Sequence, residues 1–206
     1  YCIYTGDVVT NTKYTLTDVT STCTSGGGSQ SAFRFASPVT AGSVIKASNF
    51  QVTGTNTRYG ILFYGLADST VEFTGGTISL GGNTDIPTFY NVASTVNSAI
   101  TITRMSAAAC SIFVRLLVGL SGSVITLTDV TIPASAAMGT GLWVAPAASS
   151  STIAFNRVSF TSTARALHFA SNVANTAVTL DTCTFDGNAG DNAVQVVGDI
   201  SGTSVF

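Results

Sequence analysis

One pattern, x-φ-x-φ-x-x-φ-x-φ with φ usually apolar, recurs seven times in this chain of 206 residues and limits its fold more than any other feature. The repeats are KYTLTDVTS, VIKASNFQV, TVEFTGGTI, AITITRMSA, VITLTDVTI, TIAFNRVSF and AVTLDTCTF. Their first φ residues are Tyr14, Ile45, Val71, Ile100, Ile125, Ile153 and Val178, which lie 31, 26, 29, 25, 28 and 25 residues apart. Periods in this range are typical of solenoid proteins, in which each repeat packs on its neighbours.

A second apolar alternation follows each repeat, as in AFRFA from Ala32, GILFY from Gly60 and GLWVA from Gly141. Alternation with period two, residues such as Val, Ile, Phe and Thr, and Gly or Asn at the ends indicate short strands and turns. Within the repeat, the x-x pair turns the chain and returns the next φ residue to the same inner face. One repeat therefore forms one coil.

We predict an all-β fold, a single-stranded parallel β-helix (β-solenoid) of about seven coils of 25–31 residues, with residues 1–206 as one domain. Stacked coils lie about 4.8 Å apart and hydrogen-bond to the coils on either side. Inward residues should then form ladders, the first made by the first φ residues of the repeats. The second ladder consists of Leu16, Ala47, Phe73, Ile102, Leu127, Phe155 and Leu180.

These coils resemble the right-handed parallel β-helix of the pectin-lyase-like superfamily, over nearly the whole chain. The resemblance implies right-handed winding, which is also the usual chirality of parallel crossovers. The charge-poor composition, rich in Ser, Thr, Val and Ala, also resembles giant repetitive surface proteins of kinetoplastid protozoa, the dispersed gene family. The polysaccharide lyases of the superfamily need paired carboxylates or a calcium site with a basic Arg, and no such set transfers to this sequence.

Composition excludes several other classes of function. With 8 Lys plus Arg against 10 Asp plus Glu and no basic cluster, the chain lacks the cations that neutralise nucleic-acid phosphates. His168 is the only histidine and no cysteines form a CxxC pair, which argues against a zinc site. We predict no cofactor, and no stretch reads as a membrane span.

Both ends of the sequence look like cut coils. YCIYTG resembles the second strand of a coil, and SGTSVF repeats the SGSVIT that starts at Ser121. Open solenoid ends expose strand edges and core. We therefore expect either an excerpt of a longer solenoid or a subunit that associates end to end with its neighbours in a filament.

The bend of the repeat carries Arg104, Asp129 and Arg157 on three successive coils. One interpretation is a binding site for acidic sugar, and the other, which we favour, is a surface ion-pair ladder of small energetic worth. Gly, Asn and Asp at the other bends suit unusual backbone angles. On the neighbouring strand, Glu72 lies one coil from Lys46 and is expected to form an ion pair.

Two weaker site candidates follow. Asp186, Asn188 and Asp191 gather oxygen ligands of the kind that calcium prefers, although an ordinary turn explains them better. Cys2 and Cys23 lie about one coil apart and can pair as a disulfide.

The second alternation also predicts an outward contact strip, which we call the predicted contact strip. Its members are Leu62, Tyr90, Phe113, Trp143 and His168. Exposed apolar strips mark contacts with partners, and aromatic rows can stack on sugar rings. The alternative is that a long loop covers the strip.

These observations favour a non-enzymatic extracellular or cell-surface β-solenoid, a rigid adhesive or structural segment of a surface protein or filament. Its expected partners are further copies end to end, neighbouring solenoid modules, or glycans. The alternative is a carbohydrate-binding or polysaccharide-degrading β-helix that uses the predicted contact strip.

Overall fold

The computed structural model describes residues 3–23, 31–54, 59–80, 87–108, 111–133, 139–145, 147–163, 165–187 and 192–205. All elements in these ranges are β-strands or turns, and every strand pairing is parallel. The predicted all-β solenoid is therefore confirmed. The described residues contain no helix that is long and apolar enough to cross a membrane.

Three sheets form the walls of the solenoid, and we number them in the order in which each coil passes through them. Sheet 1 has the main strands β3 (Lys13–Thr17), β7 (Val44–Gly54), β10 (Thr70–Leu80), β13 (Ala99–Ala108), β16 (Val124–Thr128), β20 (Thr152–Asn156) and β24 (Ala177–Asp181). Beyond the bend it adds β4 (Thr20–Cys23), β17 (Thr131–Ile132), β21 (Ser159–Thr163) and β25 (Thr184–Gly187). Sheet 2 has β1 (Ile3–Thr5), β5 (Ser31–Phe35), β8 (Tyr59–Phe63), β11 (Pro87–Asn91), β14 (Ile112–Leu116), β18 (Thr140–Val144), β22 (Arg165–Phe169) and β26 (Val194–Val196). Sheet 3 has β2 (Val9–Thr10), β6 (Val39–Thr40), β9 (Leu66–Ala67), β12 (Thr95–Val96), β15 (Leu120–Ser121), β19 (Ala148–Ser149), β23 (Val173–Ala174) and β27 (Ile200–Ser201).

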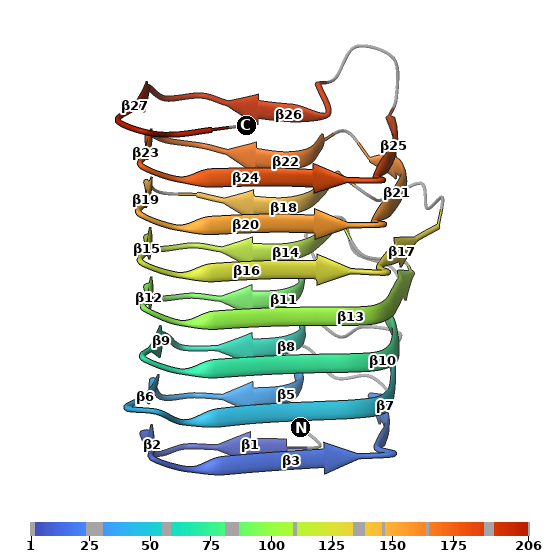
Figure 1. Cartoon of the computed structure of the whole chain (residues 1–206). Helices are drawn as coiled ribbons and strands as arrows, with labels where there is room; N and C mark the ends of the chain where they lie inside the picture. The colour runs from blue at the N-terminus through green and yellow to red at the C-terminus, as the bar shows by residue number, and fades with distance from the viewer. Residues whose placement is uncertain are drawn as a thin grey trace.

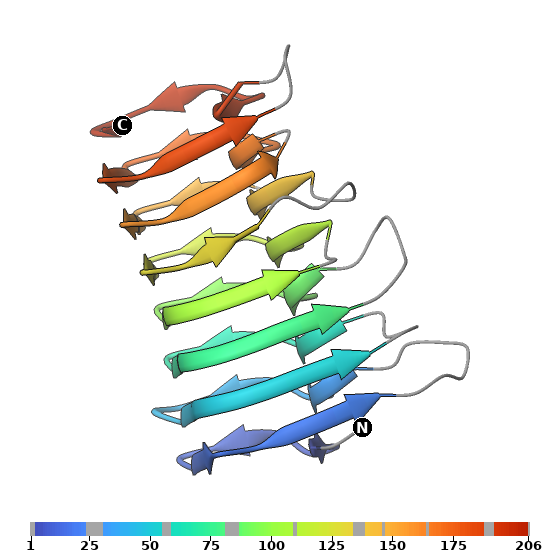
Figure 2. The ribbon, with the colours of Figure 1, turned by 90° about the vertical axis from the view of Figure 1, so that its right-hand side faces the viewer.

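The coils wind in the right-handed sense. In Figure 1 the chain passes from left to right through the sheet 1 strands at the front and returns through the sheet 2 strands behind them, while it rises from the N-terminus to the C-terminus. Seen from the side in Figure 2, the sheet 1 strands stack as one continuous wall. This winding agrees with the handedness that parallel crossovers prefer.

Both predicted inward ladders are present in sheet 1. Each first φ residue pairs in register with its equivalent on the next coil, as Ile100 does with Ile125, and the second ladder follows in the same way. In the inner coils the second ladder is almost fully buried, with Leu127 at 0% exposure. The stacked apolar rows therefore form one core along the axis.

The bend in sheet 1 depends on left-handed backbone conformation. The second x residue of every repeat has a positive φ between 50° and 60°, and these residues are Asp18, Asn49, Gly75, Arg104, Asp129, Arg157 and Thr182. Asn, Asp and Gly adopt this region most readily, as predicted. Arg104, Arg157 and Thr182 follow the same path because the pairing of the flanking strands fixes the bend.

A buried hydroxyl ladder connects the coils at the turn from sheet 3 to sheet 1, and the sequence analysis did not predict it. The serine Oγ of one coil accepts the backbone N–H of the serine in the coil before, as from Ser98 N to Ser123 Oγ at 3.1 Å and from Ser123 N to Ser151 Oγ at 3.2 Å. Each hydroxyl donates to a carbonyl of its own turn, for example Ser123 Oγ to Ser121 O at 2.9 Å. The ladder residues are Thr12, Ser43, Ser69, Ser98, Ser123, Ser151, Thr176 and Ser204. Each is a Ser or Thr two residues before the first φ position, which is the sequence signal that identifies the ladder.

Candidate functional site

Sheet 2 presents one outward row of mostly large side chains, which we call the outward row. The alternation of each strand produces it, because Arg34 points outward between the buried Phe33 and Phe35. Strand pairing then places the equivalent residues of successive strands next to one another. The row runs Tyr4, Arg34, Leu62, Tyr90, Arg115, Trp143, His168 and Gln195.

The outward row contains four of the five residues of the predicted contact strip, but Phe113 does not belong to it. Phe113 is fully buried, and its ring contacts those of Phe89 and Phe160 with centroids 5.4 and 6.2 Å away. Simple alternation fails here because the first three residues of β14, starting with Ile112, are all buried where the chain enters sheet 2 from a corner. Arg115 occupies the outward position on this strand instead.

Neighbouring side chains of the outward row stack on one another. The Arg115 guanidinium carbon lies 5.5 Å from the ring centroid of Tyr90 and 4.5 Å from that of Trp143. Trp143 in turn stacks on His168, with centroids 5.5 Å apart and planes inclined by 23°. Both faces of the Trp143 ring are thus covered by protein. A sugar ring therefore has no free indole face to stack on, and only the ring edge remains for a ligand.

At its other end the outward row has a second arginine. Arg34 lies over the rings of Tyr4 and Tyr64, at 5.9 and 5.3 Å from their centroids. Its Nη2 donates a hydrogen bond of 3.1 Å to the Tyr64 hydroxyl. Between Arg34 and Tyr90 lies Leu62, which is only 1% exposed and is therefore not an exposed apolar contact as predicted.

The charged side chains on the described strands of sheet 2 are all basic. Its described strands contain three arginines, Arg34, Arg115 and Arg165, and no acidic residue. Burial lowers the pKa of His168, and the nearby positive charge of Arg165 lowers it further. Burial also raises the pKa of Tyr90, against the opposing effect of Arg115. His168 and Tyr90 are therefore both neutral at pH 7.

Within the part of the chain that the structure describes, several nitrogens of the outward row are buried without a hydrogen-bond partner. They are Nε of Arg115, Nε1 of Trp143 and both ring nitrogens of His168. His168 as a whole is 9% exposed. Buried polar atoms without partners are rare in proteins and commonly mark a place where water, an ion or a ligand binds.

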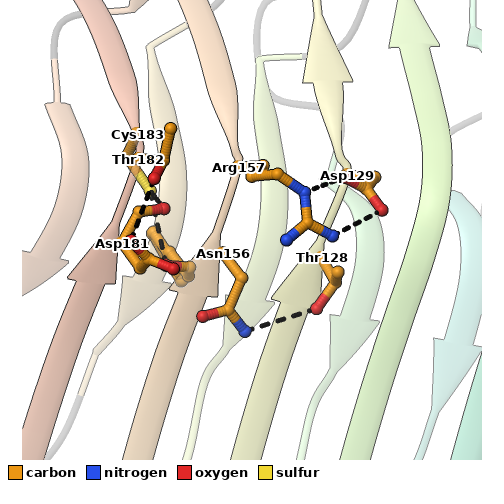
Figure 3. A network of polar contacts seen from close by, with 8 residues as sticks. Thr128, Asp129, Asn156, Arg157, Asp181, Thr182 and Cys183 are labelled. Carbon is orange, nitrogen blue, oxygen red and sulfur yellow. Dashed lines mark hydrogen bonds and ion pairs between the residues drawn. The ribbon is translucent and has the colours of Figure 1, made fainter.

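The bend ladder of sheet 1 forms the second charged cluster (Figure 3). Arg157 binds Asp129 of the preceding coil in a bidentate manner, with Nε–Oδ1 at 2.6 Å and Nη2–Oδ2 at 2.9 Å. This hydrogen bond from Arg157 holds the pKa of Asp129 below its ordinary value, and the charge of Arg104 lowers it slightly more. Because the pair is largely exposed to solvent, it contributes little to stability. Of the three residues of the predicted ladder, Arg157 and Asp129 thus form an ion pair, whereas no ion pair joins Arg104 to Asp129 among the described residues.

Other sequence candidates are placed as follows. Lys46 and Glu72 form the expected ion pair, at 2.6 Å. Asp186 is an exposed residue of β25, whereas Asn188 and Asp191 lie outside the described residues. Within the described ranges, no group of three His, Cys, Asp or Glu side chains could hold a metal ion.

Of the predicted cysteine pair, only Cys23 lies within the described residues. Cys2 lies outside the described residues, so the pairing of Cys2 with Cys23 stays a prediction. Cys183, which follows β24 after the bend, has a free, half-buried thiol that packs against the core. Its Sγ lies 3.4 Å from the carbonyl oxygens of Phe155 and Asp181.

Comparisons of this chain with protein-family models, curated proteins and solved structures find no match. Its candidate site consequently rests on the geometry of the outward row alone.

Proposed function

We propose that this chain is a non-enzymatic segment of a rigid extracellular or cell-surface rod, in which β-solenoid coils stack end to end. The observation that carries the proposal is the stacking of the coils in register. In the second inward ladder, each residue pairs with its equivalent on the next coil, and Leu127 and Phe155 are fully buried. A stack of this kind can continue by the addition of further coils.

A solenoid is a good mechanical spacer because each coil contacts only its neighbours, so its length scales with the number of coils. The extracellular location is supported by the Ser- and Thr-rich surface and by the low number of charged residues, 18 in 206. Its outer rows are available as contact surfaces.

Deletion of one whole coil tests the rod. Removal of residues 99–123 joins Ser98 directly to Val124. Because Val124 is the register equivalent of Ala99 on the next coil, it takes the place of Ala99 after Ser98. The inward ladders and the hydroxyl ladder therefore stay in phase. We expect a folded rod shorter by one strand spacing, about 4.8 Å.

The matched control is removal of residues 99–122, which leaves one extra residue before Ile125 and puts the repeat out of phase. Thermal unfolding followed by far-ultraviolet circular dichroism should show a stable β-fold for the first deletion and a less stable one for the control. Electron microscopy of the native protein that contains this segment should show rods or filaments with an axial repeat. Cooperative collapse of the in-phase deletion, or discrete globular particles, would contradict the rod.

A further inference from the structure

We propose that Tyr59 and Tyr90 are a site of oxidative modification, at which a one-electron oxidant derived from peroxide joins their rings as dityrosine. The two residues lie on β8 and β11, neighbouring strands of sheet 2 that belong to successive coils. The new bond would therefore cross-link two coils covalently. The inference concerns the side wall of the solenoid and does not rest on the proposed rod.

The first argument is the contact between the two rings. Their centroids lie 4.9 Å apart and their planes are inclined by 31°. At this separation the nearest carbons of the two rings are close to van der Waals contact, about 3.5–4 Å. Such a pair stabilises a fold by packing alone, but two phenol rings this close also meet the geometric requirement for coupling to each other.

The second argument is the access of solvent to both phenols. Tyr59 and Tyr90 are each half-buried, so small solutes reach part of each side chain. Burial raises the pKa of Tyr90 and the charge of Arg115 opposes this effect, while the phenols of Tyr59 and Tyr64 raise the pKa further. The phenol groups of these tyrosines therefore lie near one another, and Tyr90 keeps its proton at pH 7.

The third argument is that Tyr90 is held in place. The Arg115 guanidinium carbon lies 5.5 Å from the centroid of the Tyr90 ring, and it also lies 4.5 Å from the centroid of Trp143. A ring restricted in this way stays beside Tyr59, which raises its effective concentration toward that ring. Tyr14 offers a contrast, because its ring contacts that of Phe35, which has no hydroxyl group and forms no phenoxyl radical.

The reaction balances with peroxide as the oxidant. Each phenol loses one electron and one proton, which leaves a neutral phenoxyl radical on each ring. The two radicals combine through a bond between two Cε carbons, ortho to the hydroxyl groups. Each displaced Cε hydrogen then moves to the phenolic oxygen as the ring regains its aromaticity. The pair thus loses two hydrogen atoms, and one hydrogen peroxide accepts two electrons and two protons to become two molecules of water.

The sequence permits a direct test, because Glu72 is the only glutamate of the chain. Digestion after Lys, Arg and Glu separates residues 59–72, which contain Tyr59 and Tyr64, from residues 73–104, whose only tyrosine is Tyr90. The folded protein should first be treated with microperoxidase and hydrogen peroxide. We expect mass spectrometry of the digest to find the two peptides joined, with the loss of two hydrogen atoms, and dityrosine fluorescence to increase.

Phenylalanine variants then locate the bond. Tyr59→Phe and Tyr90→Phe should each lower the yield of the joined peptides at least about tenfold, because the remaining radical lacks a nearby partner. Tyr14→Phe is the matched control, since it removes a tyrosine hydroxyl from another contact, and it should leave the yield unchanged. Circular dichroism should show the same fold for all three variants.

Three results would overturn the proposal. One is oxidation that consumes tyrosine without joining the two peptides. Another is an undiminished yield in Tyr59→Phe, which would assign the bond to Tyr64. The third is a yield that rises with protein concentration or is equally high in urea, which would indicate coupling by random encounter. None of these results would affect the rod, whose test is the in-phase coil deletion.

Discussion

Replacement of Ser123 by alanine tests whether the buried hydroxyl ladder stabilises the stack of coils. Ser123 Oγ accepts the N–H of Ser98 at 3.1 Å and donates to Ser121 O at 2.9 Å. Ser123 is 1% exposed and Ser98 3% exposed, so water has little access to the groups that the substitution leaves behind. A buried donor without a partner costs about 1–3 kcal/mol, and we expect Ser123→Ala to lower the free energy of unfolding by about 2 kcal/mol.

Two further variants isolate the hydroxyl group. Ser121→Ala, two residues away in the same turn, removes a hydroxyl whose bond is to the Ser149 hydroxyl at 3.2 Å on the outer side. It should change the unfolding free energy by less than about 0.5 kcal/mol. Ser123→Thr keeps the ladder hydroxyl and should restore much of the loss, because Thr176 occupies the same position in a later coil with its side chain fully buried.

Urea unfolding followed by circular dichroism measures these differences, with linear extrapolation to water. Because a solenoid sums local stabilities, Trp143 fluorescence in the following coil should show the same order of midpoints. If Ser123→Ala were no more destabilising than Ser121→Ala, the ladder would carry no stabilisation and the reasoning from its hydrogen bonds would be wrong.

Three other predictions concern packing and pH. Gly141→Ala should destabilise the fold by about 1–3 kcal/mol, since its new Cβ would clash with the ring of Phe160. Gly139→Ala is the matched control: its Cβ would meet nothing closer than 3.5 Å, so the change should be nearly neutral, and denaturant midpoints compare the two variants. Phe113→Ala should cost about 3–5 kcal/mol in the same assay, as expected of a fully buried ring and not of a surface contact. Because the pKa of His168 is lowered in the folded state, protonation favours unfolding. The free energy of unfolding should therefore be constant above about pH 6.5 and fall below it. His168→Gln should remove the contribution of His168 to this fall, and identical pH profiles for the two proteins would show that His168 does not cause it.

The inner part of the fold could be predicted because it repeats. A ladder position that recurs as Ile100, Ile125 and Ile153 specifies strand, register and inner face at once. The bend could be predicted for the same reason, since Asn49 and Gly75 tolerate the left-handed conformation that all coils need. Periodicity thus predicts the inward ladders and the bend that the coils share.

The candidate site was harder to predict because it depends on where alternation fails. Strict alternation along β14 would point Phe113 outward, but where the chain enters sheet 2 its side chain instead turns into the core. The equivalent residues in two other coils, Gly60 and Gly141, have no side chain and leave room there for neighbouring side chains. That error hid Arg115, and with it the cationic character of sheet 2. The hydroxyl ladder was missed for a different reason, since Ser and Thr are so frequent here that their recurrence in one position attracts no notice.

Inner ladders and outer rows have separate physical roles. The apolar ladders and the turn hydroxyls hold successive backbones about 4.8 Å apart, whatever side chains point outward. Outward residues can therefore differ between coils without changing the rod, as Leu62 and Arg115 do in one row.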